Sequence, residues 1–151
     1  MPNDWTVGFV DTNVLLYAFV EHTESGRKSQ IAKALVGTLA SENRICLSTQ
    51  VILEFTANSI RRSSSTDAPS ATASVVRNLS EWPLFTVDAD AIMEAINVKS
   101  RNQLSIWDAL IIVAAKRMRA SVLYTEDLNH GQLIEGVRVV NPFLTELEQP
   151  T

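Results

Sequence analysis

The feature that most constrains the fold is an alternation between short β-rich runs and longer segments in which apolar residues recur at helical spacing. The short runs predict strands, and the longer segments predict amphipathic helices. Parallel strands need crossover connections, which are usually helices. We therefore expect an α/β fold, a three-layer α/β/α sandwich whose central sheet is mainly parallel and roughly five-stranded. The strands are predicted at residues 6–10, 44–47, 82–87, 121–124 and 137–140.

Helix starts are indicated by three residues that can act as N-caps and by one proline that suits a first turn. These residues are Ser48, Pro69, Asp88 and Ser105. The helix after Asp88 is predicted to have one apolar face. That face is formed by Ala89, Ile92, Met93 and Ile96. The helix after Ser105 is the most apolar and is expected to run to about Arg119, whereas residues 61–67 have the composition of a polar loop.

The chain has 151 residues, of which 46% are hydrophobic, and this is enough for one ordinary core. We predict a single domain spanning residues 1–151. The longest apolar runs, such as residues 109–115, fall short of the ~20 residues that cross a bilayer, so no membrane association is expected. Because the first five residues do not resemble a secretory signal, we expect a cytoplasmic protein.

The formal charge of −4 argues against a protein that coats nucleic acid through bulk electrostatics, so any contact with nucleic acid must be local. Cys46 is the only cysteine, which excludes an internal disulfide and a cysteine-rich zinc site. Its neighbours predict a buried strand position. Of the two histidines, His22 lies in a polar loop, where a lone histidine is more often solvated than catalytic. His130 follows Asp127 by three residues and is a minor candidate to reach the edge of a site there.

Four carboxylates interrupt or end apolar segments: Asp11, Glu54, Asp108 and Asp127. Three of them have a structural explanation. Asp11 can cap the helix that follows it, Asp108 has capping-box spacing from the Ser105 cap, and Asp127 can close a turn. Glu54 is harder to explain in this way, because apolar residues flank it on both sides.

Taken together, these carboxylates indicate a metal site. Asp11 and Asp127 follow predicted strands, while Glu54 and Asp108 lie in the first two turns of predicted helices. Such positions gather at the carboxyl edge of a parallel sheet, where open α/β folds bind ligands. Four like charges repel one another there, and a hard cation that prefers oxygen ligands, Mg²⁺ or Mn²⁺, would reconcile them. A metal of this kind can activate water for attack on phosphorus.

Four segments in this order resemble the successive acidic motifs of PIN domains, and the best match is to the VapC toxins of type II toxin-antitoxin pairs. The segments are Val10-Asp-Thr-Asn-Val-Leu-Leu-Tyr-Ala18, Ser48-Thr-Gln-Val-Ile-Leu-Glu-Phe55, Ser105-Ile-Trp-Asp-Ala-Leu-Ile-Ile112 and Leu123-Tyr-Thr-Glu-Asp127. The resemblance covers nearly the whole chain. It implies a Mg²⁺- or Mn²⁺-dependent endoribonuclease, usually a homodimer, that acts on an RNA substrate and is blocked by a cognate antitoxin.

The resemblance also implies roles for individual residues. It gives Asp11, Glu54, Asp108 and Asp127 as the catalytic and metal-binding carboxylates. The small polar residues that hydrogen-bond these carboxylates or metal waters would be Thr12, Asn13 and Thr125. The segment from Arg61 to Ser70 lies in a region where such toxins vary, so no residue that selects the RNA can be carried over.

Cations near the motif-bearing helices are candidates to hold an RNA backbone, because an acidic protein needs local positive charge for that purpose. They are Arg61, Arg62, Lys99 and Arg101. Charges at helix ends are more often solvated or paired with the helix dipole. Tyr17 and Trp107 have the type of side chain that stacks on bases, but aromatics within apolar helices more often belong to a core or a dimer interface.

Two alternatives remain open. Asp11 followed by Thr12 loosely resembles the nucleophile loop of haloacid-dehalogenase-like phosphatases, but Asn13 stands where that loop needs a second aspartate. No lysine falls between Lys116 and Asp127, where such a phosphatase would carry one. The other alternative is a catalytically inactive PIN scaffold that binds RNA or protein. The four intact carboxylates argue against it, because carboxylates that repel one another are easily lost when they have no use.

Overall fold

We describe the protein from a computed structural model, which covers residues 6–20, 26–63 and 66–145. The expectations for the first five residues and for His22 lie outside these ranges. Six strands form one sheet in the order β3-β2-β1-β4-β6-β5, and all neighbours are parallel except β5 and β6. Their bounds are β1 Gly8–Val10, β2 Ile45–Ser48, β3 Leu84–Phe85, β4 Val122–Tyr124, β5 Leu133–Ile134 and β6 Val137–Val140.

The prediction of a mainly parallel α/β sheet is confirmed, and all five expected strands are present. The sequence did not reveal β5, a two-residue strand that forms an antiparallel hairpin with β6. The turn between them consists of Glu135 and Gly136, both with positive φ. This conformation matches a two-residue hairpin turn, but glutamate is not among the residues that usually signal one, and so the sequence pattern was inconspicuous.

The helices begin where their caps predict. The Ser48 hydroxyl accepts a hydrogen bond from the Val51 amide, and the Ser105 hydroxyl accepts one from the Asp108 amide. Asp88 caps its helix in the same way. The bounds are α1 Thr12–Phe19, α2 Gly26–Ser41, α3 Thr49–Arg62, α4 Ala68–Leu79, α5 Ala89–Asn102 and α6 Ile106–Arg117.

Two predicted boundaries were wrong by a short distance. Arg61 and Arg62 belong to the last turn of α3 and not to a loop. Helix α6 ends at Arg117, before the predicted Arg119, which adopts positive φ. Helix termini depend on capping contacts and tertiary packing, which apolar periodicity does not encode.

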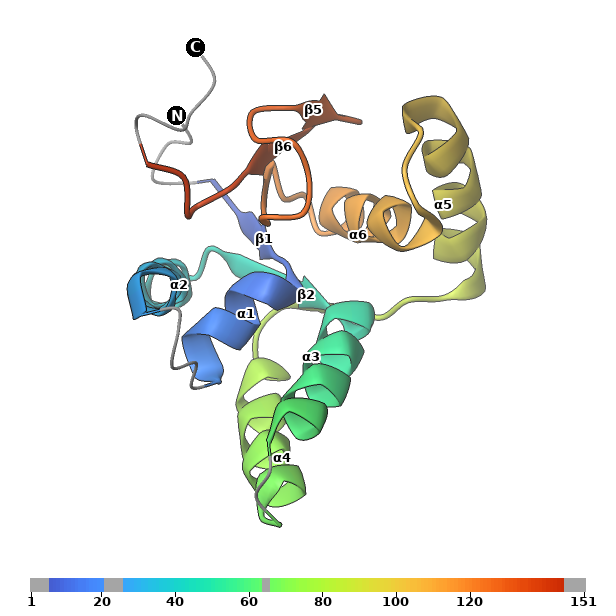
Figure 1. Cartoon of the computed structure of the whole chain (residues 1–151). Coiled ribbons are helices and arrows are strands. Elements are labelled where there is room, and N and C mark those ends of the chain that lie inside the picture. The colour runs from blue at the N-terminus through green and yellow to red at the C-terminus, as the bar shows by residue number, and fades with distance from the viewer. Residues whose placement is uncertain (1–5, 21–25, 64–65, 146–151) are drawn as a thin grey trace.

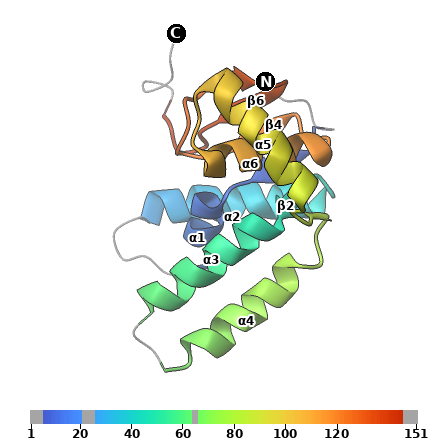
Figure 2. The ribbon, with the colours of Figure 1, turned by 90° about the vertical axis from the view of Figure 1, so that its right-hand side faces the viewer.

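The helices lie in two layers on opposite sides of the sheet, as Figures 1 and 2 show. Helices α5 and α6 pack together on one side, and α1 and α2 lie on the other. Helices α3 and α4 form a pair that extends away from the sheet (Figure 2). Strands β1, β2 and β4 are buried along their whole length, since both faces of the central sheet are covered. Cys46 is buried within β2, as predicted.

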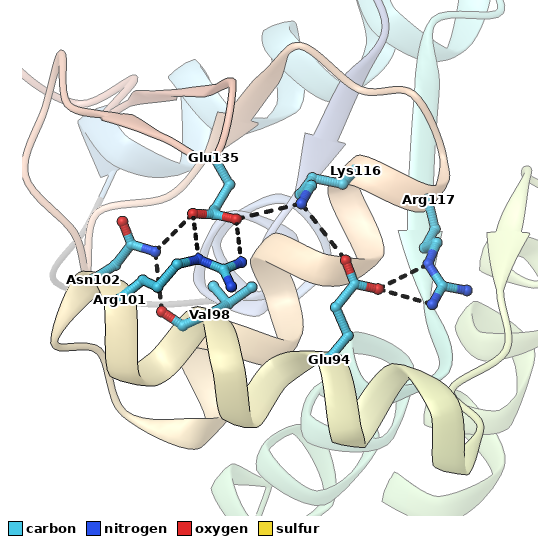
Figure 3. A network of polar contacts seen from close by, with 7 residues as sticks. All are labelled: Glu94, Val98, Arg101, Asn102, Lys116, Arg117 and Glu135. Carbon is cyan, nitrogen blue, oxygen red and sulfur yellow. Dashed lines mark hydrogen bonds and ion pairs between the residues drawn. The ribbon is translucent and has the colours of Figure 1, made fainter.

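Helix α5 was predicted correctly, but its apolar face was misjudged. Ala91, Ala95 and Val98 are fully buried, whereas the predicted face is exposed to solvent. A face of small side chains lets α5 approach α6 closely. Ion pairs beside that face also hold α5 in place (Figure 3). Glu94 pairs with Lys116 and Arg117 of α6, and Arg101 in the last turn of α5 pairs with Glu135 in the β5–β6 turn.

No helix in the described ranges is long and apolar enough to cross a membrane. The largest fully buried side chains come from both strands and helices, which places the core between the sheet and its two helical layers. These include Phe9, Leu15, Leu47, Phe55, Ile112 and Leu123.

Candidate active site

Asp11 lies at the centre of the carboxyl edge of the sheet, directly after β1 and before α1. Its side chain is 7% exposed. Oδ1 accepts a hydrogen bond of 2.7 Å from the Thr12 amide, and Oδ2 accepts one of 2.8 Å from the Thr125 hydroxyl. Asp11 therefore does cap α1, as its structural explanation requires, but the second oxygen is held by a residue 114 positions away.

Glu54 reaches this edge from the second turn of α3. Its Oε2 accepts a hydrogen bond of 3.0 Å from the Thr12 hydroxyl, and its Oε1 accepts one of 3.1 Å from the Gln50 side-chain amide. Thr12 thus touches two carboxylates, Asp11 through its main chain and Glu54 through its side chain. This arrangement fixes the start of α3 against the start of α1.

Asp127 is held at the same edge by Asn13. The Asn13 amide nitrogen donates to the Asp127 carboxylate and to the Thr125 hydroxyl, both at 3.0 Å. The Thr125 hydroxyl also accepts from the Asp127 main-chain amide and donates to Asp11. The hydroxyl of Thr125, which is fully buried, therefore accepts two hydrogen bonds and donates one to Asp11.

The electrostatics of this edge are unfavourable for negative charge. Burial, with a smaller contribution from the charges of Asp127 and Glu54, raises the pKa of Asp11 to about 6, although the hydrogen bonds from Thr12 and Thr125 act to lower it. None of the ion pairs among the described residues includes any of these three carboxylates. Neutral donors orient the carboxylates here but do not cancel their charge.

Asp108 approaches from the other helical layer, in the first turn of α6. The Ser105 hydroxyl accepts a hydrogen bond from the Asp108 main-chain amide. In the described structure the Asp108 carboxylate does not accept a hydrogen bond from the Ser105 amide, so only half of the capping box is formed. Asp108 and Asp127 line the same hollow of about 420 Å³, together with the residues that follow α5. The fold therefore groups Asp11, Glu54 and Asp127 through shared hydrogen-bond donors and places Asp108 in the lining of the same hollow as Asp127.

Residues 8–134 match the family model described as the PIN domain. This chain belongs to the PIN domain family. The phosphatase alternative is therefore wrong. No curated protein sequence matches the chain significantly.

Solved structures with a similar fold include chains of toxin-antitoxin proteins. A chain of a toxin-antitoxin complex from Klebsiella pneumoniae is 19% identical, with 89% of this chain and 97% of that chain covered and a TM-score of 0.66. The sarcin-ricin loop cleaving toxin VapC20 from Mycobacterium tuberculosis is 20% identical, with coverage of 80% and 91% and a TM-score of 0.62. DNA-bound VapBC from Salmonella typhimurium is 19% identical, with coverage of 89% and 96% and a TM-score of 0.63. At these identities the likeness establishes the fold.

The carboxylates of this PIN domain suit a hard divalent cation in the chemistry of their donors. All four offer oxygen, and within the described ranges no ion pair involves Asp11, Glu54 or Asp127. However, no three His, Cys, Asp or Glu side chains in the described ranges are already arranged to hold one ion. The carboxylate oxygens of Asp11, Glu54 and Asp127 instead accept hydrogen bonds from Thr12, Thr125, Asn13 and Gln50.

The predicted RNA-binding cations occupy two helix ends. Arg61 and Arg62 lie at the end of α3, beyond Glu54, and the Arg61 guanidinium donates to Asn58. Lys99 and Arg101 lie at the end of α5, just before the residues that line the acidic hollow, and Arg101 is paired with Glu135. Their role in RNA binding stays a prediction.

His130 does not line the acidic hollow of the PIN domain. Its Nδ1 accepts a hydrogen bond from the Asn141 amide. The ring lines a separate hollow of about 530 Å³ that contains none of the four carboxylates. This hollow lies beside the start of β4 and the end of β6, and so His130 is set apart from the carboxylates.

Sequence reasoning missed two contacts that shape this site. Gln50 stands four residues before Glu54, and this spacing puts both side chains on one helix face. The spacing was the sequence signal from which their contact could have been predicted. The other contact is the ion pair of 2.7 Å between Lys28 and Glu126, the neighbour of Asp127, which Tyr17 joins through a hydrogen bond to Glu126. No local pattern predicts it, since Lys28 lies 98 residues from Glu126.

Proposed function

We propose that this protein is a Mg²⁺- or Mn²⁺-dependent endoribonuclease that hydrolyses RNA phosphodiester bonds, and that it is the toxin of a VapBC-type toxin-antitoxin pair. The observation that carries the proposal is the buried Asp11 carboxylate, which lies near Glu54 and Asp127 and has no cationic partner in the part of the chain that the structure describes. Membership of the PIN domain family supports the nuclease. The likeness in fold to chains of toxin-antitoxin complexes supports the toxin.

In the proposed site, Asp11, Glu54 and Asp108 hold one metal ion, and Asp127 helps to hold a second ion or orders its water. A bound Mg²⁺ or Mn²⁺ would supply positive charge to the phosphate oxygens and make water a better nucleophile. The residues that surround the carboxylates keep them oriented. Thr12 and Thr125 restrain the acids beside α1, and Asn13 restrains Asp127.

We propose one PIN domain over residues 1–151, in a cytoplasmic protein that works as a homodimer and binds a cognate antitoxin. Exposed apolar side chains favour a protein partner, because large apolar side chains gathered on one helix face usually mark an interface. On α5 these are Ile92, Met93 and Ile96, with exposures of 46%, 64% and 53%. Trp107 is 65% exposed, so it belongs to a surface and not to the core.

RNA would be held locally beside the acidic hollow. The cations at the end of α5, Lys99 and Arg101, are proposed to contact the phosphate backbone there. Arg61 and Arg62 would act as a second contact along α3. Since Arg101 is already paired with Glu135, we expect Lys99 to contribute more than Arg101 to RNA affinity.

The proposed function is tested by incubating end-labelled RNA with the purified, antitoxin-free chain in Mg²⁺, Mn²⁺ or EDTA. The wild type is expected to cut only with metal. Asp11→Asn and Asp108→Asn each remove one ligand charge while nearly preserving shape, and each should slow cutting by about 100-fold or more. Circular dichroism verifies that every variant is folded.

A matched control is Asp90→Asn, which changes an exposed aspartate in the first turn of α5, on the far side of α6 from the sheet. It should cut RNA at the wild-type rate. If Asp11→Asn and Asp108→Asn also cut at that rate, their assignment as metal ligands is wrong. If the folded wild type cuts no RNA under any metal condition, the inactive PIN scaffold replaces the nuclease as the function.

A further inference from the structure

Gln50 joins two helices that carry proposed ligands. It lies in the first turn of α3 and is only 9% exposed. Its Nε2 donates to Glu54 Oε1 at 3.1 Å and to the main-chain oxygen of Trp107 at 3.2 Å. Trp107 immediately precedes Asp108. One side-chain amide therefore connects the Glu54 carboxylate on α3 to the turn of α6 that carries Asp108.

The two acceptors fix the orientation of this amide. An amide nitrogen has two N–H donors, and both are used here. Turning the amide over would bring its oxygen against the Glu54 carboxylate and the Trp107 carbonyl, two acceptors that would repel it. In the observed orientation Oε1 is buried and makes no hydrogen bond, the one such side-chain atom among the described residues.

An unsatisfied buried acceptor is a cost to the fold, so the amide is not explained by packing. A leucine or methionine would fill the same space and leave no buried polar atom without a partner. The Trp107 carbonyl does not depend on Gln50, because it lies in the first turn of α6 and is also an acceptor within that helix. What the amide provides beyond packing is its hold on Glu54.

We propose that Gln50 is a positioning residue for the metal site. It fixes the Glu54 carboxylate relative to the first turn of α6, so that Glu54 and Asp108 are presented together to a divalent cation. Thr12 restrains the other oxygen of Glu54, and the two donors leave that carboxylate little freedom to turn. The inference rests on the proposed function, because it assigns Gln50 a role at the same site.

The test compares Mn²⁺ binding and metal-free stability in the full chain with Gln50→Leu. Isothermal titration gives the dissociation constant for Mn²⁺, and thermal unfolding in EDTA gives the stability without metal. We expect Mn²⁺ to bind about 10-fold to 100-fold more weakly to Gln50→Leu, as when an outer-shell partner is lost. The melting temperature in EDTA should equal or exceed that of the wild type, because the unsatisfied oxygen is removed. Should Gln50→Leu fail to fold, Gln50→Met, which keeps the unbranched length, carries the same test.

A control variant shows what a purely structural role looks like. Thr72 is buried and shares a hydrogen bond of 2.9 Å with Ser59, between α3 and α4 and away from the carboxylates. Thr72→Val should lower the melting temperature in EDTA by a few degrees, roughly 3–5 °C, and leave Mn²⁺ affinity unchanged. If Gln50→Leu behaves like Thr72→Val, or binds Mn²⁺ as the wild type does, the proposal is overturned.

A double variant tests whether Gln50 acts through Glu54. Glu54→Gln removes the ligand, so adding Gln50→Leu to it should weaken Mn²⁺ binding no further. Additive losses would overturn the proposal, because Gln50 would then act independently of Glu54. A wild-type chain that binds no Mn²⁺ would overturn the metal site as well, whereas normal wild-type binding with an unaffected Gln50→Leu variant overturns only the role of Gln50.

Discussion

Two groups of carboxylates in this protein are held by opposite kinds of partner. At the carboxyl edge of the sheet, Asp11, Glu54 and Asp127 accept hydrogen bonds from hydroxyls, amides and main-chain N–H groups. Between α5, α6 and the β5–β6 turn, Glu94 and Glu135 are bridged by the positive side chains of α5 and α6 (Figure 3).

The pKa of Asp11 moves in the opposite direction to those of Glu94 and Glu135. Burial and neighbouring carboxylates raise the pKa of Asp11 to about 6. Hydrogen bonds from Arg101 and Asn102 lower the pKa of Glu135 to about 2, and a hydrogen bond from Arg117 lowers the pKa of Glu94. The ion pairs of Glu94 and Glu135 therefore give the second group a structural role in holding α5, α6 and the β5–β6 turn together. The first group takes part in no ion pair among the described residues and is held by neutral donors, an arrangement that suits a cation-binding site.

The sharpest contrast is expected in catalysis. Glu54→Gln and Glu94→Gln make the same chemical change on the two sides of the comparison. Glu54→Gln should reduce the rate of RNA cleavage by about 100-fold or more, because a proposed ligand is lost. Glu94→Gln should leave the rate within about 3-fold. Single-turnover cleavage of labelled RNA in Mn²⁺ measures both, and a large loss in Glu94→Gln would erase the distinction between the groups.

Replacing Asp11 should raise the stability of the metal-free protein, whereas replacing Glu54 should lower the rate of cleavage. Its folded pKa exceeds the ordinary value of 3.8, so ionisation opposes folding, and stability falls as pH rises from about 4 to 6. Asp11→Asn should therefore stabilise the protein by about 1–3 kcal/mol at pH 7 in EDTA. Urea unfolding at pH 7 and at pH 3.5 measures this, and the advantage should disappear at pH 3.5. An Asp11→Asn variant that is less stable at pH 7 would show that the cap outweighs the buried charge.

The smallest effect is expected at Glu135. Its folded pKa of about 2 lies below the ordinary value of 4.5, so its ion pairs stabilise the protein above pH 4.5 and lose that effect as pH falls towards 2. Because solvent screens these partly exposed pairs, the contribution is about 1 kcal/mol. Glu135→Gln should lower stability at pH 7 by this amount and match the wild type near pH 2. Urea unfolding across this range measures the difference in stability between Glu135→Gln and the wild type. If that difference were the same at pH 7 and near pH 2, the charge of Glu135 would not be its cause.

Much of the fold and the order of the site residues could be predicted from the sequence. The strand positions followed from short β-rich runs, and the starts of three helices followed from Ser48, Asp88 and Ser105. The positions of Asp11 after β1 and of Glu54 early in α3 followed from the same local patterns. These features depend on hydrogen bonds and periodicities that span only a few residues, so a local reading of the sequence is sufficient for them.

Other features were decided only by the tertiary structure. The face of α5 that is buried depends on how closely Ala91 and Ala95 let it approach α6, although bulkier apolar residues were available on the helix. The bond from Gln50 to Trp107 spans 57 residues, and the bond from Thr125 to Asp11 spans 114. Contacts at such separations depend on how the crossovers bring distant segments together. The sequence by itself determined which carboxylates follow strands or begin helices at this edge. Only the tertiary packing decided which carboxylates accept hydrogen bonds from the same neutral side chain and which carboxylates are paired with lysine or arginine.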